Sequence, residues 1–397
     1  MVQLAQRAQH ITESLTLAIT AKANALRMEG IDVVSFGAGE PDLPTPARIV
    51  GYARDALTEG FTKYTPSAGI LPLRQAICRQ YETLYHGHYD PSEVIVTGGA
   101  KQALYLAFLA LCSPGDEVLI PTPYWNSYVD QVQLAGGVPV FVPPTSDLGI
   151  DVAQLRARAT PKAKLLVINS PSNPSGRVLS DDELAEIAKI ARERGLFVIS
   201  DEIYEHLVYG GKIHRSIVMH HGLRDSGLVI SGVSKTLSMT GWRIGYALGP
   251  ADLIAAMARL QGHMTSCANS IAQHAALGGL SDTLSDYVAP MVAEYDKRRL
   301  YMITRLRSMA GITVSEPSGA FYAFPRVARF YGKKAAGGTP ISNSFDFARA
   351  LLDAHNVAVV PGSAFGSDEH IRLSYATSLD DIEKGLDRLE DFLRKIA

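Results

Sequence analysis

A lysine and an arginine eight residues apart are the pair of side chains in this sequence best suited to chemistry. Lys235 follows the apolar residues 228–230, which predict a buried strand, and small residues are frequent in the segment 231–245. Burial and the nearby Arg243 both disfavour the protonated amine, so Lys235 is predicted to be a nucleophile suited to an imine with a carbonyl cofactor. Arg243 and the Ser234 hydroxyl suit a phosphate on that cofactor. The alternative is a turn with a solvated lysine and a structural arginine.

The segment 234–245, Ser-Lys-Thr-Leu-Ser-Met-Thr-Gly-Trp-Arg-Ile-Gly, resembles the pyridoxal-phosphate lysine segment of class I and II aminotransferases, which have the fold called fold-type I. The likeness extends from about Ala38 to Ala376, with several motifs in the family's order. Within the family, the chain is most similar to the bacterial and plastid aspartate/prephenate aminotransferases. The resemblance implies pyridoxal 5'-phosphate as the cofactor and ping-pong transfer of an amino group.

Seven short apolar runs between residues 93 and 250 predict the strands of an α/β protein. They occupy residues 94–96, 118–120, 138–142, 165–168, 197–199, 228–230 and 244–248, and helical segments separate several of them. One such helix has clear ends, because Ser180 and Glu183 form a capping box and Gly195 closes it. The pattern predicts an open, mainly parallel sheet with helices on both faces. Such sheets bind ligands beyond the carboxyl ends of their strands.

Polar and aromatic residues directly follow five of these strands. Gly99, Ala100 and Lys101 open a helix whose free amides suit a phosphate. The residues after the other strands are Trp125, with an indole face for a flat ring, Asn173, Asp201 with Tyr204, and Lys235. Each one alone has an ordinary structural explanation, such as core packing, a turn or a helix cap. Their recurrence at consecutive strand ends favours one shared site.

The resemblance implies a role for each of these residues. Lys235 would carry the proton between the substrate and the cofactor, as general base and general acid. Asp201 would keep the pyridine nitrogen of the cofactor protonated, so that the ring acts as an electron sink. Tyr204 and Asn173 would hydrogen-bond to the ring oxygen. Trp125 would stack on the ring.

The resemblance implies that Trp125 and Asn173 also bind the substrate, together with the residues described next. Gly39, in the loop 37–42, would place its backbone against the substrate. Arg372 would hold the α-carboxylate in a bidentate pair, although a surface arginine on a strand is the alternative. Lys101 would bind a second carboxylate, with a solvated helix lysine as the alternative, and Thr16 resembles another position on the substrate side. The predicted substrates are therefore aspartate and 2-oxoglutarate, with prephenate as the nearest competitor.

The resemblance also implies a quaternary and a domain arrangement. Tyr64 would reach the cofactor phosphate of the neighbouring subunit in a homodimer, whereas a packed loop tyrosine is the alternative. Residues 46–295 would form the large cofactor-binding domain, and residues 1–45 with 296–397 a smaller α+β domain. In addition, hydrophobic periodicity predicts helices over residues 3–29 and 281–309.

Composition narrows the classes of protein to consider. The chain has 397 residues, 47% of them hydrophobic and 20% charged, which is typical of a globular protein. Its net charge of −2 gives no reason to expect nucleic acid or a membrane surface as a partner, and no apolar run is long enough to span a bilayer. The three scattered cysteines predict reduced thiols in the cytoplasm. The histidines have no HExxH spacing, so no metal is expected.

Two other functions stay open at this point. A carbon–sulfur β-lyase on the same scaffold would release ammonia and pyruvate from a thioether amino acid without a keto-acid acceptor. An aminotransferase-like DNA-binding regulator would need a basic helix-turn-helix domain before the fold. No such domain is expected here, and the net charge of −2 also argues against this function.

Overall fold

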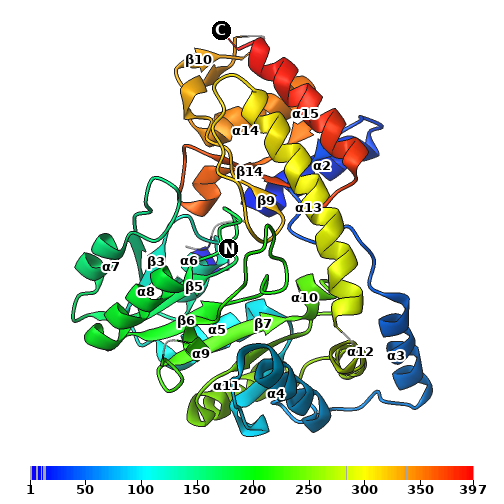
Figure 1. The fold of residues 1–397 in the computed structure, drawn as a ribbon, viewed down its shortest axis with the longest axis vertical. Helices are drawn as coiled ribbons and strands as arrows, with labels where there is room; N and C mark the ends of the chain where they lie inside the picture. The colour runs from blue at the N-terminus through cyan, green and yellow to red at the C-terminus, as the bar shows by residue number, and fades with distance from the viewer. Residues whose placement is uncertain are drawn as a thin grey trace.

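The computed structural model describes residues 2–5, 8–9, 11, 15–220, 222–282, 284–335 and 338–396. A broad sheet with surrounding helices makes up one part of the molecule, and a group of short strands and long helices packs beside it (Figure 1). The chain enters the second part early, through α2 (Leu15–Met28) and β1 (Val34–Ser35), and returns to it through the long helix α13 (Ser285–Ser308). Segments from both ends of the sequence therefore lie together.

The large sheet has seven strands in the order β2-β8-β7-β6-β5-β3-β4. Only β8 runs antiparallel to its neighbours. The strands are β2 (Val94–Thr97), β3 (Glu117–Pro121), β4 (Val138–Val142), β5 (Ala163–Asn169), β6 (Phe197–Asp201), β7 (Gly227–Gly232) and β8 (Gly245–Leu248). All seven predicted strands and the predicted α/β class are therefore confirmed.

Both faces of this sheet are buried, which explains the continuous apolar runs. Successive strand residues alternate between two hydrophobic cores, so that Val94 and Val96 enter one core and Ile95 enters the other. One core is completed by α3 (Ala47–Thr58), α4 (Leu71–Tyr85), α7 (Val152–Arg158), α8 (Asp181–Arg194), α9 (Ile217–His220) and α12 (Ser270–Ser281). The other is completed by α5 (Ala100–Leu111), α6 (Ser127–Leu134) and α11 (Ala251–Met264). Because helices cover both faces of the sheet, a ligand can reach it only at the ends of the strands.

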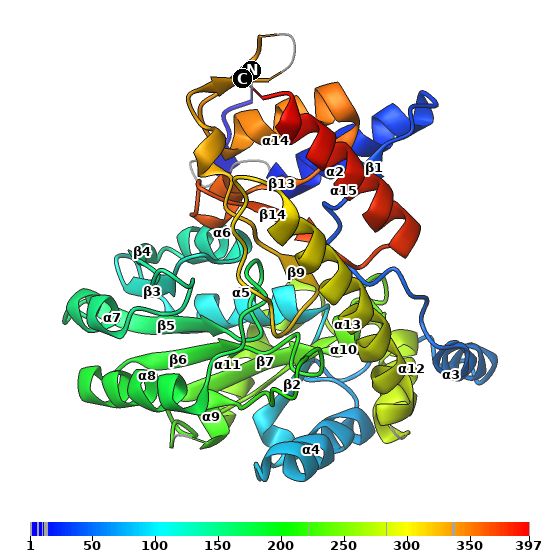
Figure 2. The same cartoon turned by 45° about the horizontal axis from the view of Figure 1, so that its top comes forward.

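The second part has a core cluster of its own, which also takes in Ile203, Tyr204, Leu207 and Tyr209 from the segment after β6. Its three-stranded antiparallel sheet has the order β13-β14-β9, and β1 pairs in parallel with β12. Its elements are β9 (Tyr322–Ala323), β10 (Lys333–Lys334), β11 (Pro340–Ile341), β12 (Val357–Ala358), β13 (Val360–Pro361), β14 (Ile371–Ser374), α13 (Ser285–Ser308), α14 (Ser344–His355) and α15 (Leu379–Arg394). Both views show α13 running from beside the large sheet into this part (Figures 1 and 2).

The helix predictions are largely confirmed. Ser180 and Glu183 form the capping box of α8, and Gly195 ends it with a φ of 65°. The helix expected over residues 281–309 is α13. The start predicted for the first helix is wrong, because residues 2–5 are not helical and Leu4 is 57% exposed, so its side chain has no core to pack on. No helix in the described part of the chain is both long and apolar enough to cross a membrane.

Gly245 lets the start of α5 approach β8 closely, and this contact can be tested. A Cβ atom at residue 245 would lie 2.1 Å from the amide nitrogen of Ala100. We expect Gly245→Ala to lower the free energy of unfolding by about 1–3 kcal/mol, as overpacking does, in urea denaturation of the cofactor-free protein. Gly51→Ala is the control, because it lies in α3 with nothing within 4 Å of its Cβ position. Unchanged stability of Gly245→Ala would contradict the packing described here.

Candidate active site

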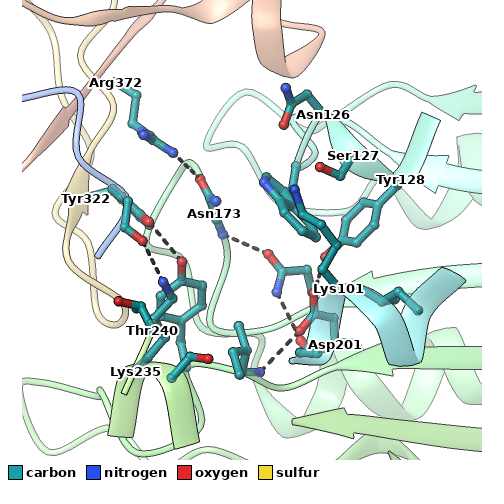
Figure 3. Close-up of a pocket in the computed structure, with 18 of the residues that line it drawn as sticks. Lys101, Asn126, Ser127, Tyr128, Asn173, Asp201, Lys235, Thr240, Tyr322 and Arg372 are labelled. Atoms are coloured by element: carbon teal, nitrogen blue, oxygen red, sulfur yellow. Dashed lines mark hydrogen bonds between the residues drawn. The ribbon is translucent and has the colours of Figure 1, made fainter. Parts of the chain in front are cut away.

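A cavity of about 250 Å³ opens at the carboxyl ends of the parallel strands (Figure 3). Eleven of the fourteen residues proposed for the cofactor and substrate line it: Gly39, Ala100, Lys101, Trp125, Asn173, Asp201, Tyr204, Ser234, Lys235, Arg243 and Arg372. Gly99 is not a lining residue, but it lies directly before Ala100 and against the guanidinium of Arg243. Tyr64 lies outside the cavity. The structure therefore brings together residues from five strand ends and from both parts of the molecule.

Lys235 lies in the short helix α10 (Val233–Thr236), directly after β7. Its Nζ donates a hydrogen bond of 2.6 Å to the carbonyl oxygen of Gly39. Burial lowers the pKa of Lys235 to about 8, with Arg372 and Arg243 acting in the same direction and Glu40 opposing them. The direction of this shift is the one inferred from the sequence. A larger fraction of the amine is neutral near pH 8 than in a solvated lysine.

Asp201 ends β6 with its side chain in the cavity wall, and it is 3% exposed. The Tyr128 hydroxyl donates to its Oδ2 at 2.6 Å, and the Ile203 amide donates to its Oδ1 at 3.3 Å. Burial raises the pKa of Asp201 to about 6, and these two donors oppose the rise. Asn169 fixes the main chain here, because its Nδ2 donates to the Asp201 carbonyl oxygen at 3.0 Å. The carboxylate is thus oriented to meet a cation.

Arg243 forms a positively charged wall beside the start of α5. Its Nη1 donates to the Thr240 carbonyl oxygen at 2.9 Å and its Nη2 to the Gly98 carbonyl oxygen at 3.1 Å. A Cβ atom at Gly99 would lie 2.4 Å from Nη2, so the missing side chain leaves the space that the guanidinium fills. None of the carboxylates in the described part of the chain forms an ion pair with Arg243. Together with the Ser234 hydroxyl and the free backbone amides at the start of α5, the Arg243 guanidinium suits a phosphate.

Arg372 is 2% exposed, so the alternative of a surface arginine is wrong. Its Nη1 donates to Asn173 Oδ1 and its Nη2 to the Gly37 carbonyl oxygen, both at 2.9 Å. Its guanidinium carbon lies 4.4 Å from the centre of the Tyr322 ring. Its Nε is buried and finds no partner among the residues that the structure describes. A buried cation whose hydrogen bonds go only to neutral groups is suited to bind an anion.

Lys101 lies across the cavity from Arg372 (Figure 3). Its Nζ lies 4.8 Å from the centre of the Trp125 ring. Burial lowers the pKa of Lys101, Arg243 adds to the effect, and Asp130 opposes it. Two cationic side chains thus lie on opposite sides of one cavity. This arrangement suits a small molecule with two carboxylates.

The sequence analysis missed four residues of the site. The Tyr322 hydroxyl hydrogen-bonds with that of Tyr204 at 2.8 Å, while Tyr128, Asn169 and Thr240 support residues already named. Asn169 ends β5 and Thr240 lies inside the segment 234–245, so a strand end and a motif were usable signals for these two residues. Tyr322 lies in an apolar segment where nothing marks it.

Tyr64 does not line the cavity of this single chain. Tyr64 lies in the loop between α3 and α4 and is 88% exposed, so the alternative of a packed loop tyrosine is wrong. Thr16 lies at the start of α2, but its side chain is outside what the structure describes. The roles proposed for Tyr64 and Thr16 stay predictions.

A mainly parallel sheet with a buried lysine, a buried carboxylate and a cationic wall at its strand ends is the arrangement expected for the class I and II aminotransferases. Residues 31–389 match the family described as aminotransferase class I and II. The chain belongs to this family, and the resemblance stated from the sequence is confirmed.

Known members are similar over their whole length. The aspartate aminotransferase of Bacillus sp. (strain YM-2) is 46% identical over 394 residues, which are 98% of this chain and 99% of that protein. The probable aspartate/prephenate aminotransferase of Aquifex aeolicus is 42% identical over 397 residues, 99% of each chain. The crystal structure of the aspartate aminotransferase from Rhizobium meliloti superimposes with a TM-score of 0.96 at 38% identity and covers 100% of both chains.

The lowered pKa of Lys235 predicts how its reactivity depends on pH. Only the neutral amine attacks a carbonyl, so the rate of reductive labelling of the cofactor-free protein by pyridoxal and cyanoborohydride should reach half its maximum near pH 8 at Lys235. A solvated lysine has a pKa of about 10.4, and its labelling should still be rising at pH 9.5. Peptide mass spectrometry measures the labelling of Lys235 and of the solvated lysines in one sample. Parallel pH profiles for Lys235 and the solvated lysines would contradict the lowered pKa.

Proposed function

We propose that this protein transfers the amino group of L-aspartate to 2-oxoglutarate, giving oxaloacetate and L-glutamate, with pyridoxal 5'-phosphate as its cofactor. The observation that carries the proposal is the pair of cations, Arg372 and Lys101, on opposite sides of a cavity that also holds the Lys235 amine. Aspartate and 2-oxoglutarate each present two carboxylates to such a pair. The relatives named aspartate aminotransferase support aspartate as the amino donor.

The residues of the cavity fit pyridoxal 5'-phosphate. Arg243, which has no carboxylate partner among the described residues, would hold the phosphate together with Ser234 and the first amides of α5. Asp201 would pair with the ring nitrogen, and Trp125 would cover the ring. Tyr204 and Asn173 would hydrogen-bond to the ring oxygen. When bound, the cofactor supplies an electron sink for the negative charge that develops at the substrate α-carbon.

The protein's own side chains orient the substrate and move its proton. The Arg372 fork would bind the α-carboxylate and fix the direction of the α-carbon–hydrogen bond. Lys235 Nζ would take the proton from the α-carbon and later return a proton, as general base and then general acid. A pKa of about 8 suits both roles, since the neutral and the protonated amine are each accessible near neutral pH. A keto acid leaves, and a second keto acid reverses the sequence.

Lys101 would select substrates with a second carboxylate, and Thr16 would contribute to the same side. Prephenate, which is also a dicarboxylate keto acid, is a second candidate acceptor. The relative named probable aspartate/prephenate aminotransferase favours it. The same site could therefore serve both acceptors with glutamate or aspartate as the amino donor.

The assembly and the location are also proposals. A homodimer in which Tyr64 reaches the partner's phosphate site would explain why this aromatic side chain is 88% exposed. The division into residues 46–295 and residues 1–45 with 296–397 is supported by the two sheets, whose strands fall on opposite sides of these boundaries. The free thiols of the three cysteines support a reducing compartment such as the cytoplasm.

A panel of amino donors tests the proposed activity. Purified protein is loaded with pyridoxal 5'-phosphate, and aspartate, glutamate, alanine and a thioether amino acid are added in turn while the cofactor absorbance is followed. We expect aspartate and glutamate to change the spectrum, and 2-oxoglutarate or prephenate to restore it.

Lys235→Ala should lose more than 99% of turnover, because it lacks the general base, and should give no borohydride-trapped adduct at residue 235. A colourless wild-type protein that forms no adduct would overturn the proposal. Release of ammonia and pyruvate from the thioether without any acceptor would favour a β-lyase.

The role of Lys101 makes a separate prediction about specificity. Lys101→Ala should lower kcat/KM for aspartate about 10- to 100-fold, the effect of losing one charge-assisted hydrogen bond, and that for alanine less than about threefold. Lys189→Ala, which removes an exposed lysine from α8, is the control and should change neither value. Steady-state assays with both donors measure the ratio. Equal losses for aspartate and alanine would show that Lys101 does not bind the second carboxylate.

A further inference from the structure

Tyr128 contacts both residues that would hold the ring of the cofactor. Its hydroxyl donates to Asp201 Oδ2 at 2.6 Å. Its ring packs edge-on against Trp125, with 5.5 Å between ring centres and an interplanar angle of 90°. Figure 3 shows Tyr128 on the same side of the cavity as Lys101, pointing towards Asp201. Nothing in the sequence motifs marked this tyrosine.

The position of Tyr128 is firmly determined by the fold. It is the second residue of α6, and its amide donates to the Trp125 carbonyl oxygen at 3.1 Å, so the two aromatic residues are one turn apart. Its side chain is 2% exposed and packs in the same core as Val132. Burial raises the pKa of the Tyr128 hydroxyl well above its ordinary value, and Asp201 adds to the effect. The phenol therefore stays protonated and acts as a donor to the carboxylate.

Asp201 has few other groups to stabilise its charge. Besides Tyr128, only the Ile203 amide donates to it among the described residues, over a longer distance of 3.3 Å. Glu202, the next residue, disfavours its ionisation, while the more distant Lys235 favours it. The Tyr128 hydroxyl is thus the shortest contact of a carboxylate that is otherwise left in an environment of low polarity. A carboxylate can accept about four hydrogen bonds, so capacity remains on the side of the cavity.

We propose that Tyr128 is a positioning residue whose hydroxyl orients the Asp201 carboxylate and stabilises its anionic form, so that this carboxylate would pair with the ring nitrogen of the cofactor. This inference rests on the proposed function. By packing against Trp125, the same side chain also holds the spacing between the residue that covers the ring and the residue that pairs with its nitrogen. Removal of the hydroxyl leaves the carboxylate with one donor, so Asp201 takes up its proton at a higher pH.

Tyr128→Phe tests the proposal, because it removes the hydroxyl and keeps the ring. The measurement is the dissociation constant of pyridoxamine 5'-phosphate, which binds without a covalent bond to Lys235, in fluorescence titrations of the cofactor-free protein from pH 5 to 8.5. In the wild type, affinity should fall below about pH 6, where Asp201 becomes protonated. In Tyr128→Phe, the midpoint of this fall should lie about one pH unit higher, and the affinity at pH 7 should be up to about tenfold weaker.

Two further variants separate this role from a general packing role. In an Asp201→Asn background, Tyr128→Phe should change the affinity less than about twofold, because a residue that acts through Asp201 has nothing left to act on. Tyr85→Phe is the matched control, since it also removes a buried phenol–carboxylate hydrogen bond of 2.6 Å, to Glu205. It should leave the affinity and the midpoint unchanged. Urea denaturation of each variant shows that it is folded.

The outcomes are distinguishable. Equal weakening in the wild-type and Asp201→Asn backgrounds would overturn the proposal, because Tyr128 would then act through packing alone. An unchanged midpoint in Tyr128→Phe would also overturn the proposal. If the wild-type protein still bound the cofactor, the proposed function would not be affected by that result. A wild-type protein that binds neither pyridoxal 5'-phosphate nor pyridoxamine 5'-phosphate would remove both.

Discussion

The burial of a cation without an anion is the constraint on which the rest of the site depends. Arg372 lies between the rings of Tyr322 and Phe365, and its hydrogen bonds go to neutral oxygens. Such an arrangement costs free energy in the free protein. Asn173 extends from the large sheet and Gly37 from the other part of the chain, so both parts must be folded and packed together to keep the guanidinium in place. A carboxylate that binds to Arg372 therefore meets a guanidinium that is already held in place before binding.

The same low polarity shifts the pKa values of the two central titratable groups towards neutrality, in opposite directions. Burial lowers the pKa of Lys235 to about 8 and raises that of Asp201 to about 6. A base whose pKa lies close to the working pH can both accept and return a proton. A carboxylate whose ionisation depends on its partners responds strongly to a cation placed against it. One physical cause, the position of both groups at the buried ends of adjacent strands β6 and β7, therefore prepares the two for different tasks.

The sequence predicted the large sheet well because strands buried on both faces must be continuously apolar, and residues such as Asp201 and Lys235 interrupt that pattern at the ends. Where an interaction joins distant segments, no local pattern exists. Tyr204 and Tyr322 are 118 residues apart, and Tyr128 and Asp201 are 73 apart. The burial of Arg372 likewise could not be inferred from its strand, since alternation alone places it on the surface. The first helix was predicted to start too early. Leu4 fits the hydrophobic periodicity of a helix, but its side chain is exposed and has no core to pack against.

The neighbouring acids Asp201 and Glu202 show why burial and charge alone do not identify a functional carboxylate. Both are buried, but at the end of β6 their side chains differ in surroundings. Glu202 accepts hydrogen bonds from Ser200 and Ser216 at 2.7 and 2.8 Å, and its other oxygen lies 3.0 Å from His214 Nε2. Because the hydrogen-bond acceptors of the Glu202 carboxylate are used within the protein, this side chain stabilises the fold. Asp201 has two donors and lines the cavity, so its remaining acceptor capacity is available to a ligand. Unused hydrogen-bonding capacity, more than burial, therefore distinguishes the residue that acts on a ligand from the one that supports it.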